Sequence, residues 1–199
     1  MTTARDLALV ALGLPPDRLV EQGDLSLALA GAEAVDLVQR GALTLDGDRM
    51  MPGPRPATGD RLLDQAAAAL VRQEPHETVE DWLWRRGNGL TEAYVDELDR
   101  AGFLVHPQGH GFRARFAPTM PADSPERRRA EERRASGEPV LAALTDVLRI
   151  GHAPLDTGES LAGDAAALLA AVGDAVAQLE AVRLRRGVED AAFDNVWRG

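Results

Sequence analysis

The 199-residue chain contains no cysteine, no lysine and no long uncharged apolar segment. Without cysteine it forms no disulfide, no thiolate metal site and no cysteine nucleophile. Asp164 and Asp174 bracket the longest apolar run, which is shorter than the roughly 18 residues that a membrane-spanning helix needs. The N-terminus shows no charged-then-apolar leader. We therefore expect a cytoplasmic protein that does not span the membrane.

Basic residues are also too few to balance the acidic ones. There are 32 acidic and 22 basic residues, so the formal net charge is -10. A field of that sign repels nucleic acid and anionic lipid at long range, and any such contact must be local. Every basic residue is arginine and alanine is abundant, a pattern typical of a high-GC bacterial genome.

Aromatic residues make up only 4% of the chain, which leaves little material for a large sheet. Alanine and leucine favour helices. The pattern predicts a mainly α fold: one domain over residues 1–199, built as a multi-helix bundle with two small β-hairpins. Apolar spacing and capping residues, with Thr58, Thr78 and Ser124 as N-caps, predict helices over residues 25–40, 58–73, 78–86, 91–100, 124–134 and 160–187, and an apolar segment that opens at Pro139.

Both hairpins are predicted from turn residues. Asp46 and Gly47 lie between two short apolar-containing runs, and glycine accepts the positive φ of a tight turn. The second hairpin is predicted to pair residues 103–105 with residues 111–116, across a longer turn that begins at His106.

No known catalytic pattern is present. His106 and His110 are four residues apart, but they lie on a predicted turn without the adjacent glutamate of a metalloprotease helix. The carboxylates are distributed as helix caps and solvated faces. We therefore predict no catalytic residue, no metal ligand and no cofactor. An enzyme whose site is assembled from scattered residues stays open as an alternative.

The helix predicted over residues 78–86 carries the candidate contact residues. Trp84 points about 140° away from Val79, so the two lie on different faces. An outward tryptophan beside Arg85 suits an interfacial membrane or partner contact, because indole combines a large apolar surface with a polar N–H. Trp84, Arg85 and Arg86 are therefore the predicted lipid- or partner-binding residues. In the other interpretation, another helix covers Trp84.

A winged-helix nucleic-acid binder is a further alternative, since residues 78–116 read as two helices followed by a hairpin. Nucleic-acid binding requires basic side chains on the second helix. That helix carries Glu92, Asp96, Glu97 and Asp99 against Arg100 alone. We therefore expect no nucleic-acid partner.

Four stretches resemble the Golgi phosphoprotein 3 family in their order and spacing. The most specific is Thr-Gly-Asp-Arg-Leu-Leu-Asp at residues 58–64. The resemblance covers about residues 5–160, and the chain looks like a bacterial member of the family. The matching stretches are residues 37–45, 56–64, 77–82 and 98–104.

The resemblance implies a mainly helical single-domain fold without known catalytic activity. In eukaryotic relatives it implies a peripheral membrane adaptor that binds phosphatidylinositol 4-phosphate and retains glycosyltransferases in the Golgi. We therefore expect a non-catalytic adaptor at the inner face of the membrane, whose partners are anionic phospholipid head groups and a membrane-associated protein.

The head-group residues of the eukaryotic family members do not carry over to this chain. Their pocket uses a tryptophan and three arginines, and this sequence has Glu21, Ala30, Asn88 and Thr91 at the matching places. Arginine forks bind phosphate with two parallel hydrogen bonds, which none of these four side chains provides. The resemblance thus predicts the fold, while the family's head-group site is not kept.

Overall fold

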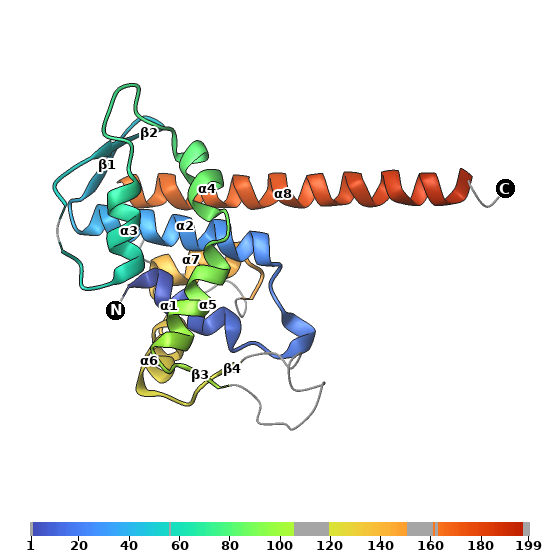
Figure 1. Cartoon of the computed structure of the whole chain (residues 1–199), viewed down its shortest axis with the longest axis horizontal. Helices are drawn as coiled ribbons and strands as arrows, with labels where there is room; N and C mark the ends of the chain where they lie inside the picture. The colour runs from blue at the N-terminus through green and yellow to red at the C-terminus, as the bar shows by residue number, and fades with distance from the viewer. Residues whose placement is uncertain (1, 56, 106–119, 151–160, 162, 197–199) are drawn as a thin grey trace.

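The computed structural model describes residues 2–55, 57–105, 120–150, 161 and 163–196, and it is mainly α-helical (Figure 1). The elements in chain order are α1 (Thr3–Leu12), a 3-10 turn η1 (Pro16–Arg18), α2 (Gln22–Gln39), β1 (Leu43–Asp46), β2 (Arg49–Pro52), α3 (Arg61–Ala69), α4 (Val79–Gly87), α5 (Leu90–Arg100), β3 (Leu104–Val105), β4 (Met120–Pro121), α6 (Pro125–Ala135), α7 (Pro139–Val147) and α8 (Gly163–Val196). The predicted fold class is confirmed.

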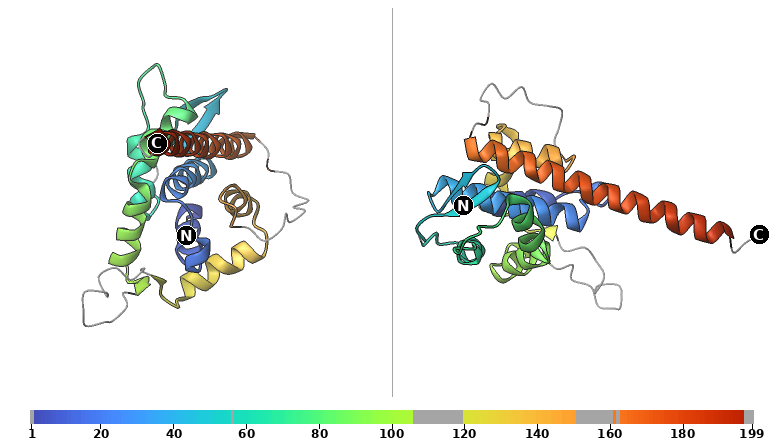
Figure 2. Two further views of the ribbon diagram at one scale, coloured as in Figure 1. Left: turned by 90° about the vertical axis from the view of Figure 1, so that its right-hand side faces the viewer. Right: turned by 90° about the horizontal axis from the view of Figure 1, so that it is seen from above.

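The helix α2 lies at the centre of the bundle. It packs against α1, α3, α4, α5, α7 and α8, and its middle residues from Leu25 to Leu37 are buried. Alanine, leucine and valine predominate between Leu25 and Leu37, and even Glu33 and Asp36 are buried there, so the middle of this helix leaves no face for solvent. Figure 2 shows α8 lying directly along α2, and Figure 1 shows the same pair from the side.

Gly31 lets α8 approach α2 closely. A Cβ atom at this position would overlap Cγ2 of Val172 on α8 and touch Leu83 on α4 at 3.7 Å. Three helices therefore meet at one residue that has no side chain. Because the neighbours are the packed ends of buried residues, little room exists for them to move.

The N-caps predicted at Thr78 and Ser124 are confirmed. Their side-chain oxygens accept hydrogen bonds from the amides of Asp81 and Arg127. The cap of α3 was predicted at the wrong residue. Asp60, not Thr58, accepts from the amides of Leu62 and Leu63, at 3.1 and 3.2 Å. Thr58 instead accepts from the amide of Asp60, at 3.1 Å. The helix begins two residues later as a result, and it ends at Ala69, before the predicted end at residue 73.

The hairpin of β1 and β2 is confirmed, with Gly47 at φ +60° in its turn. At the second hairpin, the structure shows a pairing that was not predicted. Leu104 pairs with Pro121 and Val105 with Met120, so β3 pairs with β4. The predicted partner, residues 111–116, lies outside the described residues, as do His106 and His110.

The helix α8 is longer than predicted. Its inner half buries Leu168, Leu169 and Val172 against α2, α4 and α7. An ion pair of 2.8 Å joins Arg183 to Asp24 near the start of α2. Beyond this pair the helix does not stop at Gly187 but continues to Val196, away from the other described elements (Figures 1 and 2).

Residues Gly163–Gly187 of α8 are long and apolar enough to cross a membrane by length and composition. This differs from the sequence expectation, which counted only uncharged runs. A mostly buried core helix passes the same test, but only 28% of this apolar stretch is buried, including Leu168, Val172 and Ala175.

Substitution of Gly31 by alanine is expected to destabilise the fold by about 1–3 kcal/mol, because the new methyl group overpacks the contact with Val172. Urea unfolding measures this loss. Gly173→Ala is the matched control, since the nearest atom to its Cβ is 3.9 Å away and a helix-interior glycine to alanine change stabilises by about 0.5–1 kcal/mol. Equal unfolding free energies for the two variants would contradict this account.

Candidate functional site

The three predicted contact residues lie on α4 and point in different directions. Val79, Leu83 and Gly87 recur every four residues and are buried. Trp84 lies off this face and its residue surface is 38% exposed. The outward position that periodicity predicted for Trp84 is therefore present in the fold. Successive residues of a helix are rotated by about 100°, so the side chains of Arg85 and Arg86 leave α4 in other directions and have different partners.

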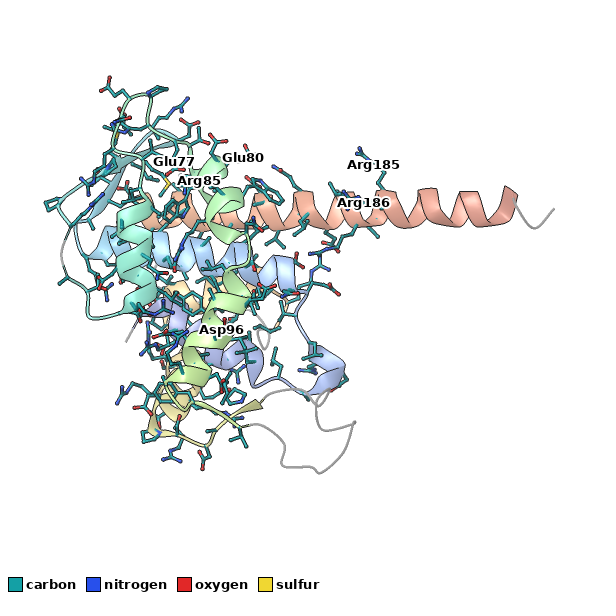
Figure 3. All side chains as sticks on the ribbon, viewed as in Figure 1. Glu77, Glu80, Arg85, Asp96, Arg185 and Arg186 are labelled. Atoms are coloured by element: carbon teal, nitrogen blue, oxygen red, sulfur yellow. The ribbon has the colours of Figure 1, made fainter. Side chains whose placement is uncertain are left out.

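Arg85 is held by Glu77 on the loop before α4 (Figure 3). Its Nη2 donates to Oε1 of Glu77 at 2.7 Å, its Nε donates to Oε2 at 3.1 Å, and Nη2 also reaches the carbonyl oxygen of Ala69 at 3.1 Å. The guanidinium stacks over the ring of Trp82, 5.4 Å from its centroid. Glu77 thus compensates the charge of Arg85 within the protein.

Arg86 points into the bundle. Its Nε and Nη2 donate to the two oxygens of Glu33 at 2.7 and 2.9 Å, and Nη2 also donates to the carbonyl oxygen of Leu62 at 3.1 Å. The hydroxyl of Tyr94 donates to Oε1 of Glu33 at 3.1 Å. This ion pair joins α2, α3, α4 and α5, and while it is intact the guanidinium is directed away from any ligand at the surface.

Burial and the ion pair itself both shift the pKa values of Glu33 and Arg86. Burial raises the pKa of Glu33, and the hydrogen bonds and charge of Arg86 oppose that rise. Burial alone lowers the pKa of Arg86, but the hydrogen bond and charge of Glu33 outweigh it, so that pKa is raised. The pKa of Tyr94 is raised well above its ordinary value, first by burial and then by the charge of Glu33. The phenol therefore stays a donor.

The described bundle buries further carboxylates, and each makes at least one contact within the fold. Asp36 accepts from the amide of Ala4 at 3.2 Å, and Asp60 caps α3 and pairs with Arg5 at 3.4 Å. Asp6 pairs with Arg133 on α6, and its other oxygen, Oδ1, has no partner among the described residues. Burial raises the pKa of Asp6 and that of Asp36. In the described part of the chain, no three histidines or carboxylates are placed to share a metal ion.

The four positions that match the family's head-group residues lie around the first half of α2. Ala30 is fully buried, and its carbonyl oxygen accepts from Nε1 of Trp82 at 3.2 Å. The hydroxyl of Thr91 is 2.8 Å from that of Ser26 and donates to the carbonyl oxygen of Gln22 at 3.1 Å. The hydroxyl of Thr91 and the carbonyl oxygen of Ala30 thus have partners within the protein. Neither residue is an arginine that could bind a phosphate group with two parallel hydrogen bonds.

Glu21 and Asn88 are helix-end residues rather than ligands in this arrangement. Glu21 is the N-cap residue of α2 and makes no capping hydrogen bond with its side chain, and Asn88 is the C-cap residue of α4. The nearby arginine is Arg183, whose two terminal nitrogens donate to Asp24 at 2.8 and 3.0 Å. The hydrogen bond to Asp24 raises the pKa of Arg183. Sequence reasoning missed this residue, although it lies one turn after Leu179 on α8.

The outer surface of α5 is acidic, as predicted. Glu92 and Asp96 are exposed, and Asp96 is seen on this helix in Figure 3. Glu97 accepts from Arg61 at 2.7 Å and from Arg100. A helix with these side chains repels phosphate, which argues against docking it in a nucleic-acid groove.

These features define a class of protein: a helical bundle around one buried central helix, with small hairpins at its edge. The family model described as Golgi phosphoprotein 3 (GPP34) matches residues 4–194. The chain belongs to the Golgi phosphoprotein 3 family. The match extends past residue 160, where the sequence resemblance had ended, and it includes most of α8. No curated protein matches the chain.

Replacing Arg86 by methionine is expected to lower the free energy of unfolding by about 3–5 kcal/mol at neutral pH, because it leaves the carboxylate of Glu33 buried without a counter-charge. Glu33 then binds a proton more readily in the folded than in the unfolded chain. The loss therefore shrinks as the pH falls toward the ordinary glutamate value of 4.5. Urea unfolding at several pH values measures this dependence.

Two further variants control this prediction. Glu33→Gln in the Arg86→Met background restores most of the stability, since no charge stays buried and the amide oxygen still accepts from Tyr94. Arg85→Met should cost less than Arg86→Met, because the guanidinium of Arg85 is half exposed and solvent screens its charge, although its partner Glu77 is buried. A loss in Arg86→Met that does not change with pH would contradict the role given to Glu33.

Proposed function

We propose that the protein is a non-catalytic, adaptor-type binding protein that acts peripherally at the inner face of the cell membrane. Trp84 is the contact residue, Arg85 lies beside it, and Arg86 fixes their helix to the core. The observation that carries the proposal is the partial exposure of Trp84 on the outer side of α4, which it shares with the exposed Glu80, Asp81 and Arg85. Its partners are phospholipid head groups and a membrane-associated protein.

Apolar contact, rather than charge, drives the proposed binding. Each uncompensated basic residue near an anionic membrane contributes about 1 kcal/mol. Glu77 and Glu33 compensate Arg85 and Arg86, and the whole chain has a net charge of -10. The indole of Trp84 does not depend on these charges, because it lies at the interface through its apolar body and its N–H. We therefore expect binding that changes little with salt.

Vesicle flotation tests the proposal. The protein should float with phosphatidylcholine vesicles that contain phosphatidylserine, and Trp84→Ala should float several-fold less. Leu19→Ala is the matched control, since Leu19 is 63% exposed on a different part of the surface and its loss should leave flotation unchanged. Absence of flotation with every lipid, or an equal effect of the two variants, would count against the membrane contact.

Vesicle flotation also tests whether this protein lacks the phosphatidylinositol 4-phosphate binding that the family resemblance implies for eukaryotic members. Because Ala30 is buried and Thr91 is engaged by Ser26, the family's head-group place offers no arginine fork for a phosphoinositide. Vesicles with phosphatidylinositol 4-phosphate should therefore bind no more protein than phosphatidylserine vesicles of equal surface charge. Selective flotation with the phosphoinositide would show that another part of the chain supplies the site.

A crosslinked pull-down from the native host tests the adaptor half. A membrane-associated protein that is recovered with the unchanged chain and lost with Trp84→Ala supports it, provided that Leu19→Ala recovers that protein. Turnover of a small molecule by the purified chain, abolished by one polar substitution, would replace the adaptor with an enzyme.

A further inference from the structure

Helix α6 is attached to the bundle through little apolar surface. Of its eleven residues, only Ala130 is buried. Eight of the others are charged, namely Glu126, Arg127, Arg128, Arg129, Glu131, Glu132, Arg133 and Arg134. By contrast, α7 buries Val140, Leu141 and Leu144 within nine residues. Because burial of apolar surface is the main attraction between packed helices, α6 supplies little of that attraction itself.

Helix α6 packs on α1 at the edge of the bundle (Figures 1 and 2). At one end of the contact, Arg133 pairs with Asp6. At the other end, Nη2 of Arg127 lies 3.6 Å from the position that a Cβ atom added at Gly13 would take. These two contacts show that α6 runs antiparallel to α1, over the stretch from Asp6 to Gly13. Leu9 lies within this stretch and is fully buried.

The contact between Arg133 and Asp6 is a buried ion pair that is only partly satisfied. Asp6 is fully buried, and its Oδ2 accepts from Arg133. Its Oδ1 has no hydrogen-bond partner among the described residues. Arg133 also pairs with Glu138, at 3.1 Å. Burial raises the pKa of Asp6 most, the charge of Asp36 on α2 adds to the rise, and Arg133 opposes it. The carboxylate is therefore under strain in the closed bundle.

A buried pair of this kind holds a helix weakly. Taking two charges out of water costs about as much free energy as their attraction gains, and an oxygen without a partner adds to that cost. Lifting α6 returns Arg133 and both oxygens of Asp6 to water. The pair of Glu33 and Arg86 differs, since both oxygens of Glu33 have partners and α2 is buried around it. Opening α6 therefore costs much less than unfolding the bundle.

The segments on either side of α6 are held by contacts that its opening leaves intact. Before α6, the amide of Ala122 donates to the carbonyl oxygen of Phe103 at 2.7 Å, next to the β3–β4 pair. After α6, Gly137 has φ +71°, in the left-handed region that glycine adopts without strain. Helix α7 then begins at Pro139, and Glu138, which is not part of α6, caps it. Rotation at these two short connections moves α6 without moving its neighbours.

From these contacts we propose that α6 is a hinged cover over α1, which opens and closes as a unit while the rest of the bundle stays folded. A helix of 11 residues is only marginally stable by itself, so α6 loses its own hydrogen bonds in the open state. The open state uncovers the side of α1 that carries Asp6. This side lies at the opposite end of the bundle from α4 (Figure 1), and the proposal does not depend on the membrane contact of Trp84.

Hydrogen exchange measured by mass spectrometry on the full chain tests the proposal. In the unchanged protein, the amides of α6 should exchange at least about tenfold faster than those of α2, whose exchange requires unfolding of the bundle. Arg133→Met leaves Asp6 buried without its counter-charge when α6 is closed, so this variant should stay open. Its α6 should then lose protection while α2 keeps slow exchange. Its free energy of unfolding should fall less than that of Arg86→Met, because the loss cannot exceed the cost of opening α6.

Two further variants control this test. Asp6→Leu with Arg133→Met places an apolar pair where the buried charges were, and α6 should then exchange more slowly than in the unchanged chain. Arg128→Met removes an exposed pair with Asp123 and should leave the exchange of α6 unchanged.

Three results would overturn the proposal. Exchange of α6 as slow as that of α2 in the unchanged protein would show that the cover does not open. A loss of stability in Arg133→Met as large as that in Arg86→Met, with α6 still protected, would show that α6 is a fixed part of the bundle. An unprotected α6 in the apolar double variant would show that the buried pair does not govern the opening.

Discussion

The ion pair of Glu33 and Arg86 is the constraint on which the arrangement of the helices depends. Glu33 is fully buried in the middle of α2, and a carboxylate there is tolerated only with a counter-charge and hydrogen bonds. Arg86 supplies the charge from α4 and Tyr94 a hydrogen bond from α5. A third N–H of the guanidinium, on Nη2, donates to the carbonyl oxygen of Leu62 on α3. Side chains or backbone from four helices thus meet at this one buried ion pair.

This pair also limits what the surface of α4 can do. Two arginines follow an exposed tryptophan in the sequence, which looks like a basic, aromatic contact for an anionic surface. In the fold, one arginine neutralises Glu77 and the other neutralises Glu33. The large apolar side chain that stays partly exposed on this helix is Trp84, and the exposed Glu80 and Asp81 lie one turn before it. A contact made by this helix therefore depends on shape and apolar surface more than on charge.

The helix caps and the first turn were predicted correctly where the signal lies within a few residues of the feature itself. Thr78, Ser124 and the Asp46–Gly47 turn act within three residues of themselves, so their roles could be read directly. The α3 cap was missed because Thr58 and Asp60 are both capping residues, and the choice between them depends on the turn at Gly59, whose φ is +73°. The extent of α8 was missed because Gly187 after three arginines is a typical helix end.

The candidate site was harder to predict because its partners are distant in the chain. Trp84 was placed outward correctly from the 3.6-residue period of α4 alone. The direction of Arg86 depends on Glu33, which is 53 residues away. No local pattern marks Glu33, since a glutamate within an alanine-rich helix usually indicates a solvated face. The signal that could have found it is the absence of any polar face on α2.

The two halves of α8 differ in their surroundings. The inner half packs on α2 up to Leu179, which lies beside Gly23, and the ion pair of Arg183 with Asp24 ends this contact. Beyond the pair, Leu184 is 66% exposed, and no other described element lies along the helix (Figures 1 and 2). The bundle therefore holds α8 through its inner half, where the packing of Val172 against Gly31 leaves little room for the two helices to shift past one another.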